Sequence, residues 1–439
     1  MLRSLLGSSL VPLLALGGTL FAPSSWASPL PRQSASWPYG PFEVSGAEMK
    51  DSRGETIVYA GTNWPGHGEV KLILETAVIP DGLQYQSIET IVSKIKSLGM
   101  NAIRLTYAIQ MVDQYYANGN KDTTVQQSFN SALGSTNGPK VYAKFLANNP
   151  SFNASTTRLD VFDAVAAECA KQQIHVHLDN HMSRAAWCCS TTDGNSWFGD
   201  KDYNVENWVR GLKFMANRGK SWTALTSMSL RNELRSPDSN PTLKSQSYNW
   251  RDWYTYSKQG SSAIHEANPD ILIFLSGLDF DTWITPVFQG TALTPGTAKY
   301  SAADFAGYAN KLVLEVHNYN NDATSCTSLK SSLYNNGFQA MHKEDAKTVN
   351  VFPVVLTEFG FAQTDAEWRR VYATCIASYL AEQKAGWFIW VVSGSYYIRS
   401  GTQDYEESWG LLSHDWSAWR SQSYVDGGLK PLVKNTARN

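Results

Sequence analysis

The chain has 439 residues, a formal net charge of −2 and a charged fraction of 17%. This balance argues against a nucleic-acid partner, because such proteins carry a basic face. The length fits one large α/β barrel with elaborated loops, or two ordinary domains. Aromatic residues are abundant, with 16 Trp and 21 Tyr. Several of them lie in polar, loop-like contexts, where they either pack under loops or stack on the apolar faces of sugars.

The N-terminus has the pattern of a secretory signal peptide. Arg3 precedes an apolar run at 5–22, and residues 25–27 form a small-residue cleavage site. We therefore expect residues 1–27 to be removed and the protein to be extracellular, with a loose Pro- and Ser-rich lead-in over 28–41. No later stretch is long and apolar enough to cross a membrane.

The five cysteines fit an oxidising compartment but leave one without a partner. Cys188 and Cys189 are adjacent in one loop-like stretch, and Cys326 lies in another. We expect a disulfide between one member of that pair and Cys326. Cys169 and Cys375 fall in helix-like stretches and are expected to be buried thiols.

Strand-like and helix-like segments alternate along the chain. The expected strands are residues 56–64, 101–107, 174–180, 226–230, 271–278, 311–319, 353–358 and 386–394, and the expected helices are residues 88–99, 158–172, 205–217, 249–267, 328–342 and 365–383. Short apolar strands separated by helices are typical of a parallel sheet buried on both faces. Eight such repeats predict an α/β protein with a (β/α)₈ TIM barrel over 42–425 and a C-terminal tail at 426–439. Long polar stretches at 65–86, 108–157 and 182–204 are expected as loops on the catalytic face.

Polar side chains gather at the carboxyl ends of the expected strands, where barrels of this class place their active sites. In the fourth strand, Met228 and Leu230 face one way while Arg231 and Glu233 face the other. The seventh strand delivers Glu358 in the same way. The residues expected to share one cleft are Arg104, His181, Asn232, Glu233, His317, Tyr319, Glu358 and Trp390. Each of these residues taken alone could be an ordinary core residue. Unrelated core residues, however, would not all lie at strand ends.

Seven short motifs in chain order resemble glycoside hydrolase family 5, the cellulase-type retaining barrel enzymes of clan A. They are G-T-N-W at 61–64, I-R-L at 103–105, L-D-N-H at 178–181, S-L-R-N-E-L at 229–234, V-H-N-Y at 316–319, T-E-F-G at 357–360 and W-F-I-W at 387–390. Any one motif is weak, whereas seven in order are specific. The resemblance covers about residues 40–425.

The resemblance implies a role for each residue of the cleft. Glu233 would be the general acid/base and Glu358 the nucleophile. Asn232 would bind the 2-hydroxyl of the sugar, and Arg104 would keep Glu358 ionised. The other implied roles are orientation of the two carboxyls by His317 and Tyr319, lining of the −1 sugar site by His181, and a floor under that sugar from Trp390.

Physical chemistry supports the same pair of carboxyls independently. Hydrolysis with retention needs two carboxyls about 5–5.5 Å apart, one protonated and one ionised. The positive charge of Arg104 favours the carboxylate of Glu358, and that negative charge favours the protonated form of Glu233. When a covalent intermediate forms, Glu358 loses its charge, and Glu233 can ionise and activate water.

Two other classes of protein fit parts of the pattern. A metal-dependent hydrolase is suggested by the His-x-His pattern of His175 and His177, with His181 and His317 nearby. This pair, however, lies on the third strand and too deep in it for an open metal site. A non-catalytic carbohydrate-binding barrel should have lost one of the two glutamates, and both are present. We therefore expect a carbohydrate substrate and neither a metal nor an organic cofactor.

The substrate is the open question within the enzyme class. An endo-β-1,4-glucanase is the family default and needs an open groove. The long loops could instead wall the site into a pocket, which favours exo-action on a β-glucoside or on a disaccharide conjugate such as a flavonoid rutinoside. His67 and Glu69 follow the first strand, where they either read a non-reducing-end sugar or anchor a loop.

Overall fold

The computed structural model describes residues 36–68 and 79–438, which fall within one compact unit, Gln33–Asn439. The expected signal peptide, the first part of the lead-in and Glu69 lie outside the described residues. Within the described ranges, the helices are too short or too polar for any of them to traverse a bilayer.

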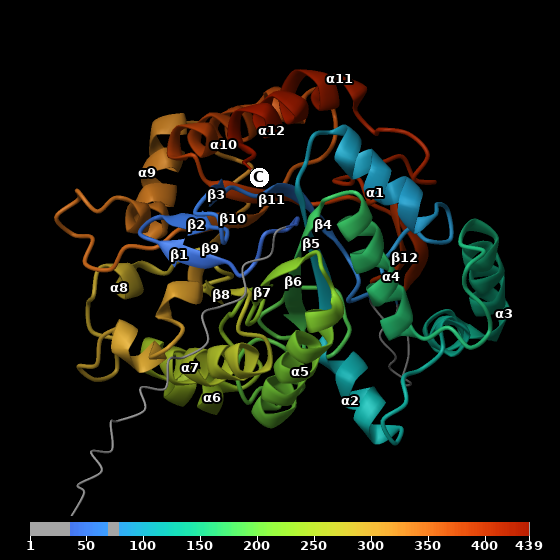
Figure 1. Cartoon of the computed structure of the whole chain (residues 1–439), viewed down its shortest axis with the longest axis horizontal. Helices are drawn as coiled ribbons and strands as arrows, with labels where there is room; N and C mark the ends of the chain where they lie inside the picture. The colour runs from blue at the N-terminus through green and yellow to red at the C-terminus, as the bar shows by residue number, and fades with distance from the viewer. Residues whose placement is uncertain (1–35, 69–78, 439) are drawn as a thin grey trace, which may run out of the picture. The chain divides into compact units, whose positions relative to one another are not determined.

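Eight parallel strands close into a barrel in which neighbours in the chain are neighbours in space, so the predicted (β/α)₈ fold is confirmed (Figure 1). The strands are β4 (Ala60–Trp64), β5 (Ala102–Ala108), β6 (His175–Met182), β7 (Leu225–Ser229), β8 (Leu272–Ser276), β9 (Leu312–Asn318), β10 (Val354–Phe359) and β11 (Gly386–Ile389). The last strand pairs with the first, with Trp387 opposite Ala60. Every strand of the barrel therefore ends at the same face.

Helices connect the strands and cover the outside of the barrel (Figure 1). They are α1 (Ile88–Ser97), α4 (Arg158–Lys171), α5 (Val205–Arg218), α6 (Pro241–Ser247), α7 (Trp250–Ala267), α8 (Thr285–Phe288), α9 (Cys326–Asn336), α10 (Val371–Gln383), α11 (Gln422–Tyr424) and α12 (Lys430–Thr436). Among them, α1, α4, α5 and α7 follow Ser87, Thr157, Asn204 and Asn249, whose side chains accept an N–H of the first turn. Such caps satisfy backbone groups that a helix leaves unpaired at its start.

The stretch 108–157, expected as a loop, contains two helices. These are α2 (Ile109–Ala117) and α3 (Val125–Asn148). A capping box of Thr124 and Gln127 starts α3, but Gly134 has φ 82° and divides it at a kink, and Pro139 follows. Glycine and proline inside the segment hid its helical character, because both residues normally interrupt helices.

Three short strands at the N-terminal end of the described chain, β1 (Glu43–Ser45), β2 (Glu48–Lys50) and β3 (Thr56–Ile57), form a separate antiparallel sheet. Side chains of this sheet pack with apolar residues of the barrel strands. The cluster consists of Phe42, Met49, Ile57, Tyr59, Ala102, Leu272, Phe274, Val313, Val355 and Phe388. Apolar side chains therefore fill much of this end of the barrel, whereas the residues predicted for catalysis lie at the carboxyl ends of the strands.

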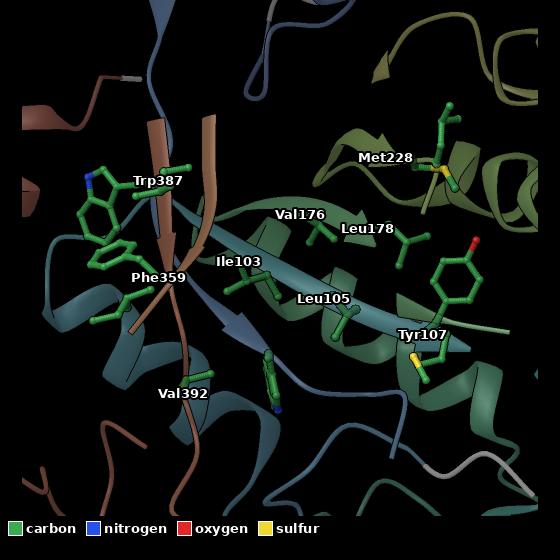
Figure 2. Close-up of a cluster of buried hydrophobic side chains, with 14 of the residues drawn as sticks. Ile103, Leu105, Tyr107, Val176, Leu178, Met228, Phe359, Trp387 and Val392 are labelled. Carbon is green, nitrogen blue, oxygen red and sulfur yellow. The ribbon is translucent and has the colours of Figure 1, made fainter. Parts of the chain in front are cut away.

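Alternate side chains along each strand point to opposite sides of the barrel wall. Ile103 and Leu105 on β5 belong to the main hydrophobic core, as do Val176 and Leu178 on β6 (Figure 2). Arg104, between the first two, instead makes buried polar contacts with residues of four other strands or strand ends. The period of two therefore sends apolar side chains toward the helices and polar ones into the barrel.

The expected pairing of Cys326 with the adjacent cysteines is wrong. Cys326 is bonded to Cys375, and Cys188 is bonded to Cys189. Cys326 starts α9 and Cys375 lies on α10, and these successive helices pack side by side (Figure 1). Because barrel order sets which helices touch, the partner of Cys326 lies on the next helix. Cys169 is a buried free thiol, as expected.

Candidate active site

A cavity of about 520 Å³ opens at the carboxyl ends of the strands. The predicted residues that line it are His181, Asn232, Glu233, His317, Tyr319, Glu358 and Trp390. The eighth, Arg104, is fully buried and donates hydrogen bonds to two of them. The volume lies within the range of ligand sites, about 300–1,000 Å³. The structure thus brings all eight predicted residues to one place.

Glu233 and Glu358 approach each other across the cavity. Glu233 follows the end of β7, and Glu358 lies near the end of β10. A carboxylate oxygen of each lies within 4.8 Å of one from the other. This upper bound is compatible with the about 5–5.5 Å between the carboxyls of retaining glycosidases and lies below the about 6.5–9.5 Å of inverting enzymes.

Arg104 joins the two glutamate-bearing strand ends. Its Nη1 donates to Glu358 Oε1 at 2.5 Å and to Asn63 Oδ1 at 2.8 Å. Its Nη2 donates to Asn232 Oδ1 at 2.7 Å and lies 3.1 Å from Asp179 Oδ1. Since the carbonyl of Asn232 is occupied, its Nδ2 remains as the donor that faces the cavity.

Burial raises the pKa of both cavity glutamates, but the groups around them differ. It raises the pKa of Glu233 to about 7, against the opposing positive charges of Arg235 and Arg104. It also raises the pKa of Glu358, where His317 and Arg104 oppose the shift. The hydroxyl of Tyr319 also donates to Glu358 Oε2 at 2.9 Å. A hydrogen bond to the charged form stabilises a carboxylate, so Glu358 ionises before Glu233.

The backbone of Glu233 is held in the left-handed region, with φ 45°. Its N–H donates to Asp281 Oδ2 at 2.9 Å, and Arg235 Nη1 donates to its carbonyl at 2.8 Å. The N–H of His317 donates to the backbone carbonyl of Asp281 at 2.9 Å. Non-glycine residues with positive φ are uncommon and gather at functional sites. The sequence analysis did not single out Asp281 or Arg235.

His317 links Glu233 to a buried carboxyl inside the barrel. Its Nδ1 lies 3.0 Å from Glu233 Oε1, and its Nε2 lies 3.0 Å from Thr357 Oγ1. The Thr357 hydroxyl lies 2.9 Å from Glu315 Oε2. Burial lowers the pKa of His317 to about 4, so the ring is neutral near pH 7. With Glu315 ionised, the Thr357 hydroxyl donates a hydrogen bond to it and accepts one from Nε2–H. Nδ1 then accepts a hydrogen bond from the protonated carboxyl of Glu233.

His181 is oriented by a carboxylate and by stacked rings. Its Nδ1 lies 2.7 Å from Asp179 Oδ2. Its ring stacks with Trp390 at 5.6 Å and with His67 at 4.0 Å. His67 is buried, and its Nδ1 lies 2.7 Å from Thr106 Oγ1. Of the two readings of His67, the structure favours the anchor, because the ring packs behind His181.

The two histidines considered as a metal pair lie in the barrel interior. Both nitrogens of His177 face hydroxyls, at 2.8 Å from Ser227 Oγ and 2.9 Å from Ser229 Oγ. Burial lowers the pKa of His175 and of His177 to about 3. Potential metal ligands gather at two places in the described ranges: Cys188, Cys189 and Glu233, and Glu233, His317 and Glu358. In the second group, hydrogen bonds already engage both nitrogens of His317.

A wall of the cavity that the sequence did not predict comes from a hairpin after β11. Its strands are β12 (Ser395–Arg399) and β13 (Thr402–Glu406). The guanidinium of Arg399 lies 3.6 Å from the ring of Trp187 and forms an ion pair with Glu407 at 2.8 Å. The ring of Trp409 lies 5.7 Å from that of Tyr319. Trp187 and Trp409 belong to the aromatic residues in polar, loop-like contexts, but nothing in the sequence marked Arg399.

Comparisons with known proteins identify the family to which the chain belongs. The model of the family described as Cellulase (glycosyl hydrolase family 5) matches residues 73–395. A glycosyl hydrolase 5 family protein of Chamaecyparis obtusa is 32% identical over 391 residues, which are 86% of this chain and 63% of that protein. An endoglucanase of Paenibacillus polymyxa is 22% identical over 406 residues, 90% of this chain and 88% of that one. The cellotetraose complex of an endocellulase from Pyrococcus horikoshii has a TM-score of 0.62 at 20% identity, over 90% and 98% of the two chains.

The barrel and the family match define the class of protein as a glycoside hydrolase. The chain belongs to glycosyl hydrolase family 5, because the family model covers most of its length. The similarity to the endocellulase supports only the fold, because the two sequences are 20% identical. The family resemblance of the seven motifs is thereby confirmed.

Proposed function

We propose that this chain is a secreted, retaining β-glycoside hydrolase that cleaves β-1,4-linked glucan in an endo manner. The observation that carries the proposal is the close pair of carboxyls, Glu233 and Glu358, within 4.8 Å of each other and in unlike surroundings. Glu358 is paired with Arg104, whereas Glu233 has its pKa raised to about 7. Endoglucanases among the relatives support the choice of glucan.

The reaction proceeds in two displacements. Glu358 attacks the anomeric carbon, and Glu233 gives its proton to the leaving oxygen, so that a covalent glycosyl–enzyme ester forms. Glu233, now ionised, takes a proton from water, and the resulting hydroxide replaces Glu358 with overall retention. Asn232 Nδ2 is placed to donate to the 2-hydroxyl, because Arg104 occupies its carbonyl. Trp390 and His181 line the same cavity and form the −1 sugar site.

Matched variants test these roles. Glu358→Gln should lose hydrolysis of every β-glycoside. Glu233→Gln should lose hydrolysis of an unactivated cello-oligosaccharide but keep the first step on a substrate with a good leaving group, because that step needs no acid. NMR of the first-formed product from cellotetraose should show the β-anomer. Near-wild-type turnover by either variant on cellotetraose, or an α-product, would reject the mechanism.

Exo-action is the second candidate, and the hairpin wall favours it. Arg399 holds Trp187 against the hairpin, and Trp187 in turn lies 6.2 Å from Trp390. This contact places a wall of the cavity beside the −1 site, whereas endo-action needs an open groove. Thin-layer analysis of products from carboxymethylcellulose, mannan, laminarin and a flavonoid diglycoside separates the two. A ladder of oligomers supports endo-action, and release of a single sugar or disaccharide supports exo-action.

Secretion is supported by the signal-like residues 1–27 and by one relative, the major extracellular endoglucanase of Xanthomonas campestris, 24% identical over 270 residues. The two disulfides also suit an oxidising compartment. Expression of the full chain should give protein in the medium that begins near residue 28. Retention of an uncleaved chain inside the cell would contradict secretion.

A further inference from the structure

We propose that the bond between Cys188 and Cys189 forms the floor of the leaving-group subsite, where it packs against the apolar face of the departing sugar ring. This inference rests on the proposed hydrolysis of β-glycosides. The roles assigned above leave these sulfur atoms without a task, although both cysteines line the cavity.

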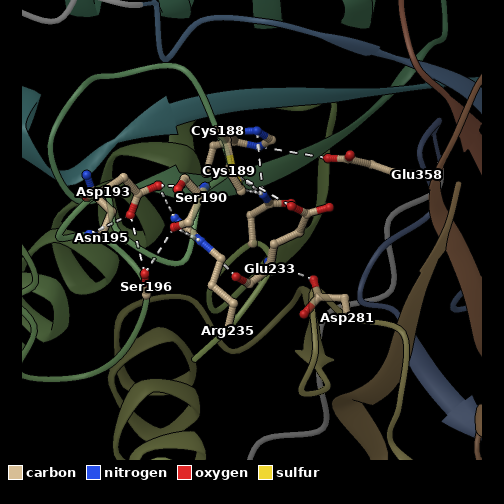
Figure 3. Close-up of a disulfide and its surroundings, with 12 residues drawn as sticks. Cys188, Cys189, Ser190, Asp193, Asn195, Ser196, Glu233, Arg235, Asp281 and Glu358 are labelled. Atoms are coloured by element: carbon tan, nitrogen blue, oxygen red, sulfur yellow. Dashed lines mark hydrogen bonds and ion pairs between the residues drawn. A yellow bond between two sulfur atoms is a disulfide. The ribbon is translucent and has the colours of Figure 1, made fainter. Parts of the chain in front are cut away.

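The disulfide lies on the acid/base side of the cavity. Cys188 Sγ is 3.8 Å from Glu233 Oε2 and 3.4 Å from Asn232 Nδ2, and Cys189 Sγ is 3.8 Å from the same amide (Figure 3). In a retaining mechanism the nucleophile faces the anomeric carbon, while the acid faces the oxygen of the leaving group. Atoms beside the acid carboxyl therefore meet the ring that departs.

Arg235 fixes the disulfide loop to the backbone of Glu233. Its Nη1 donates to the carbonyl of Glu233 at 2.8 Å, and its Nε donates to the carbonyl of Ser190 at 2.8 Å. Its Nη2 pairs with Asp193 Oδ2 at 2.6 Å (Figure 3). One buried guanidinium thus sets the position of the acid and that of the loop that follows the two cysteines. The two sulfur atoms are therefore held in a fixed position relative to Glu233.

The chemistry of a disulfide suits this place. It carries no charge and no N–H or O–H donor, and sulfur is polarizable and packs well on apolar groups. It can therefore contact the C–H face of a sugar without competing for the proton of Glu233. Reduction by dithiothreitol consumes two electrons and two protons and leaves two thiols, while dithiothreitol is oxidised to its cyclic disulfide. Each thiol is a weak donor beside Glu233, so reduction alters the subsite.

Two substrates separate the leaving-group subsite from the rest of the site. Cellotetraose has a sugar as its leaving group, whereas β-cellobiosyl fluoride releases only fluoride. We expect the double variant C188S/C189S to lose about tenfold in kcat/KM on cellotetraose, the scale of a lost apolar contact in a binding pocket. Its kcat/KM on the fluoride should fall much less, because the fluoride has no departing sugar to contact the sulfur atoms. Equal losses on both substrates, or no loss on either, would overturn the inference.

Reduction provides a second route if the double variant does not fold. The variant C326S/C375S keeps Cys188–Cys189 as its only disulfide among the residues that the structure describes, so dithiothreitol acts there alone. Treatment should lower kcat/KM on cellotetraose and spare the fluoride, and oxidation should restore it. An unchanged ratio of the two activities refutes the subsite. Failure of the wild-type protein to hydrolyse either substrate would instead refute the proposed function.

Discussion

His317 stands between Glu233 and Thr357, with one ring nitrogen 3.0 Å from each. The Thr357 hydroxyl also forms a hydrogen bond with Glu315. A series of hydrogen bonds therefore connects the cavity to a carboxyl buried in the barrel. Burial raises the pKa of Glu233 and of Glu315 to about 7. A neutral imidazole has one donor and one acceptor, so the charge at Glu315 decides whether the proton of His317 lies on Nδ1, which faces Glu233, or on Nε2, which faces Thr357.

Thr357→Val tests this line. Valine has nearly the shape of threonine but cannot accept Nε2–H or donate to Glu315, so His317 is free to change tautomer. We expect kcat/KM on cellotetraose to fall about tenfold or more, and its alkaline limb to move. Thr357→Ser restores the hydroxyl and should restore both. A Val variant with a wild-type pH profile would show that Thr357 only fills space.

The activity of the wild-type protein should fall as the pH rises above about 7, since burial raises the pKa of Glu233 to about 7 and its proton is needed for the leaving group. On the acidic side it should fall as Glu358 becomes protonated. Measurement of kcat/KM from pH 4 to 9 on cellotetraose should therefore give a bell. On β-cellobiosyl fluoride the alkaline limb should disappear, because fluoride leaves without an acid. A shared alkaline limb would assign it to another group.

The periodicity of the sequence was sufficient to predict the barrel and the strand ends. Alternation of Ile103 and Leu105 with Arg104 follows from strand geometry, so it identifies both the buried face and the polar one. Glu233 and Glu358 could be found for the same reason, since each ends a short apolar strand. Closure of the barrel then brings strands distant in sequence to one mouth.

Contacts between loops could not be predicted from the sequence, because the folded arrangement decides which loop residues meet. The contact of Arg399 with Trp187 joins two loops that are more than 200 residues apart. The Cys326–Cys375 bond depends on which helices are neighbours, and the kinked α3 contains residues that usually end helices. Local propensity carries no signal for such features, and only tertiary packing decides them.

Arg104→Met should remove the central ion pairs of the site. Arg104 is fully buried against Glu358 and Asp179, so the variant leaves buried carboxylates unpaired. We expect a loss of about 3–5 kcal/mol in the free energy of unfolding and a fall of at least about a hundredfold in kcat. Arg210→Met is the matched control, because Arg210 pairs with Asp113 at a half-exposed position. Urea unfolding should show a much larger loss of stability for Arg104→Met than for Arg210→Met. Equally small losses of stability in both variants would contradict a central role for Arg104.

Asp81 should make the stability of the protein depend on pH. Burial raises its pKa from 3.8 to about 8, against the N–H of Tyr397, which donates to Oδ1 at 2.9 Å. Between about pH 4 and pH 8 the folded state therefore holds a proton that the unfolded state has lost, so stability falls as pH rises through this window. Asp81→Asn removes that contribution and should narrow the drop in Tm between pH 5 and pH 8. Asp238→Asn is the control, because hydrogen bonds lower the pKa of exposed Asp238 to about 2 and its titration lies outside the window. An Asp81→Asn variant with the wild-type drop would contradict the protonated state.

The Cys326–Cys375 bond should contribute to stability without affecting catalysis. It ties α9 to α10 across 49 residues on the outside of the barrel, and neither cysteine lines the cavity. Closure of a loop of this length restricts the unfolded chain, and removal of such a native bond costs about 2–5 kcal/mol. The variant C326S/C375S should therefore unfold at lower urea concentration, while its kcat/KM on cellotetraose at 25 °C stays at the wild-type value. Because the Cys188–Cys189 bond remains in this variant, a fall in activity of the folded protein would mean that the packing of α9 and α10 reaches Glu358 through β10.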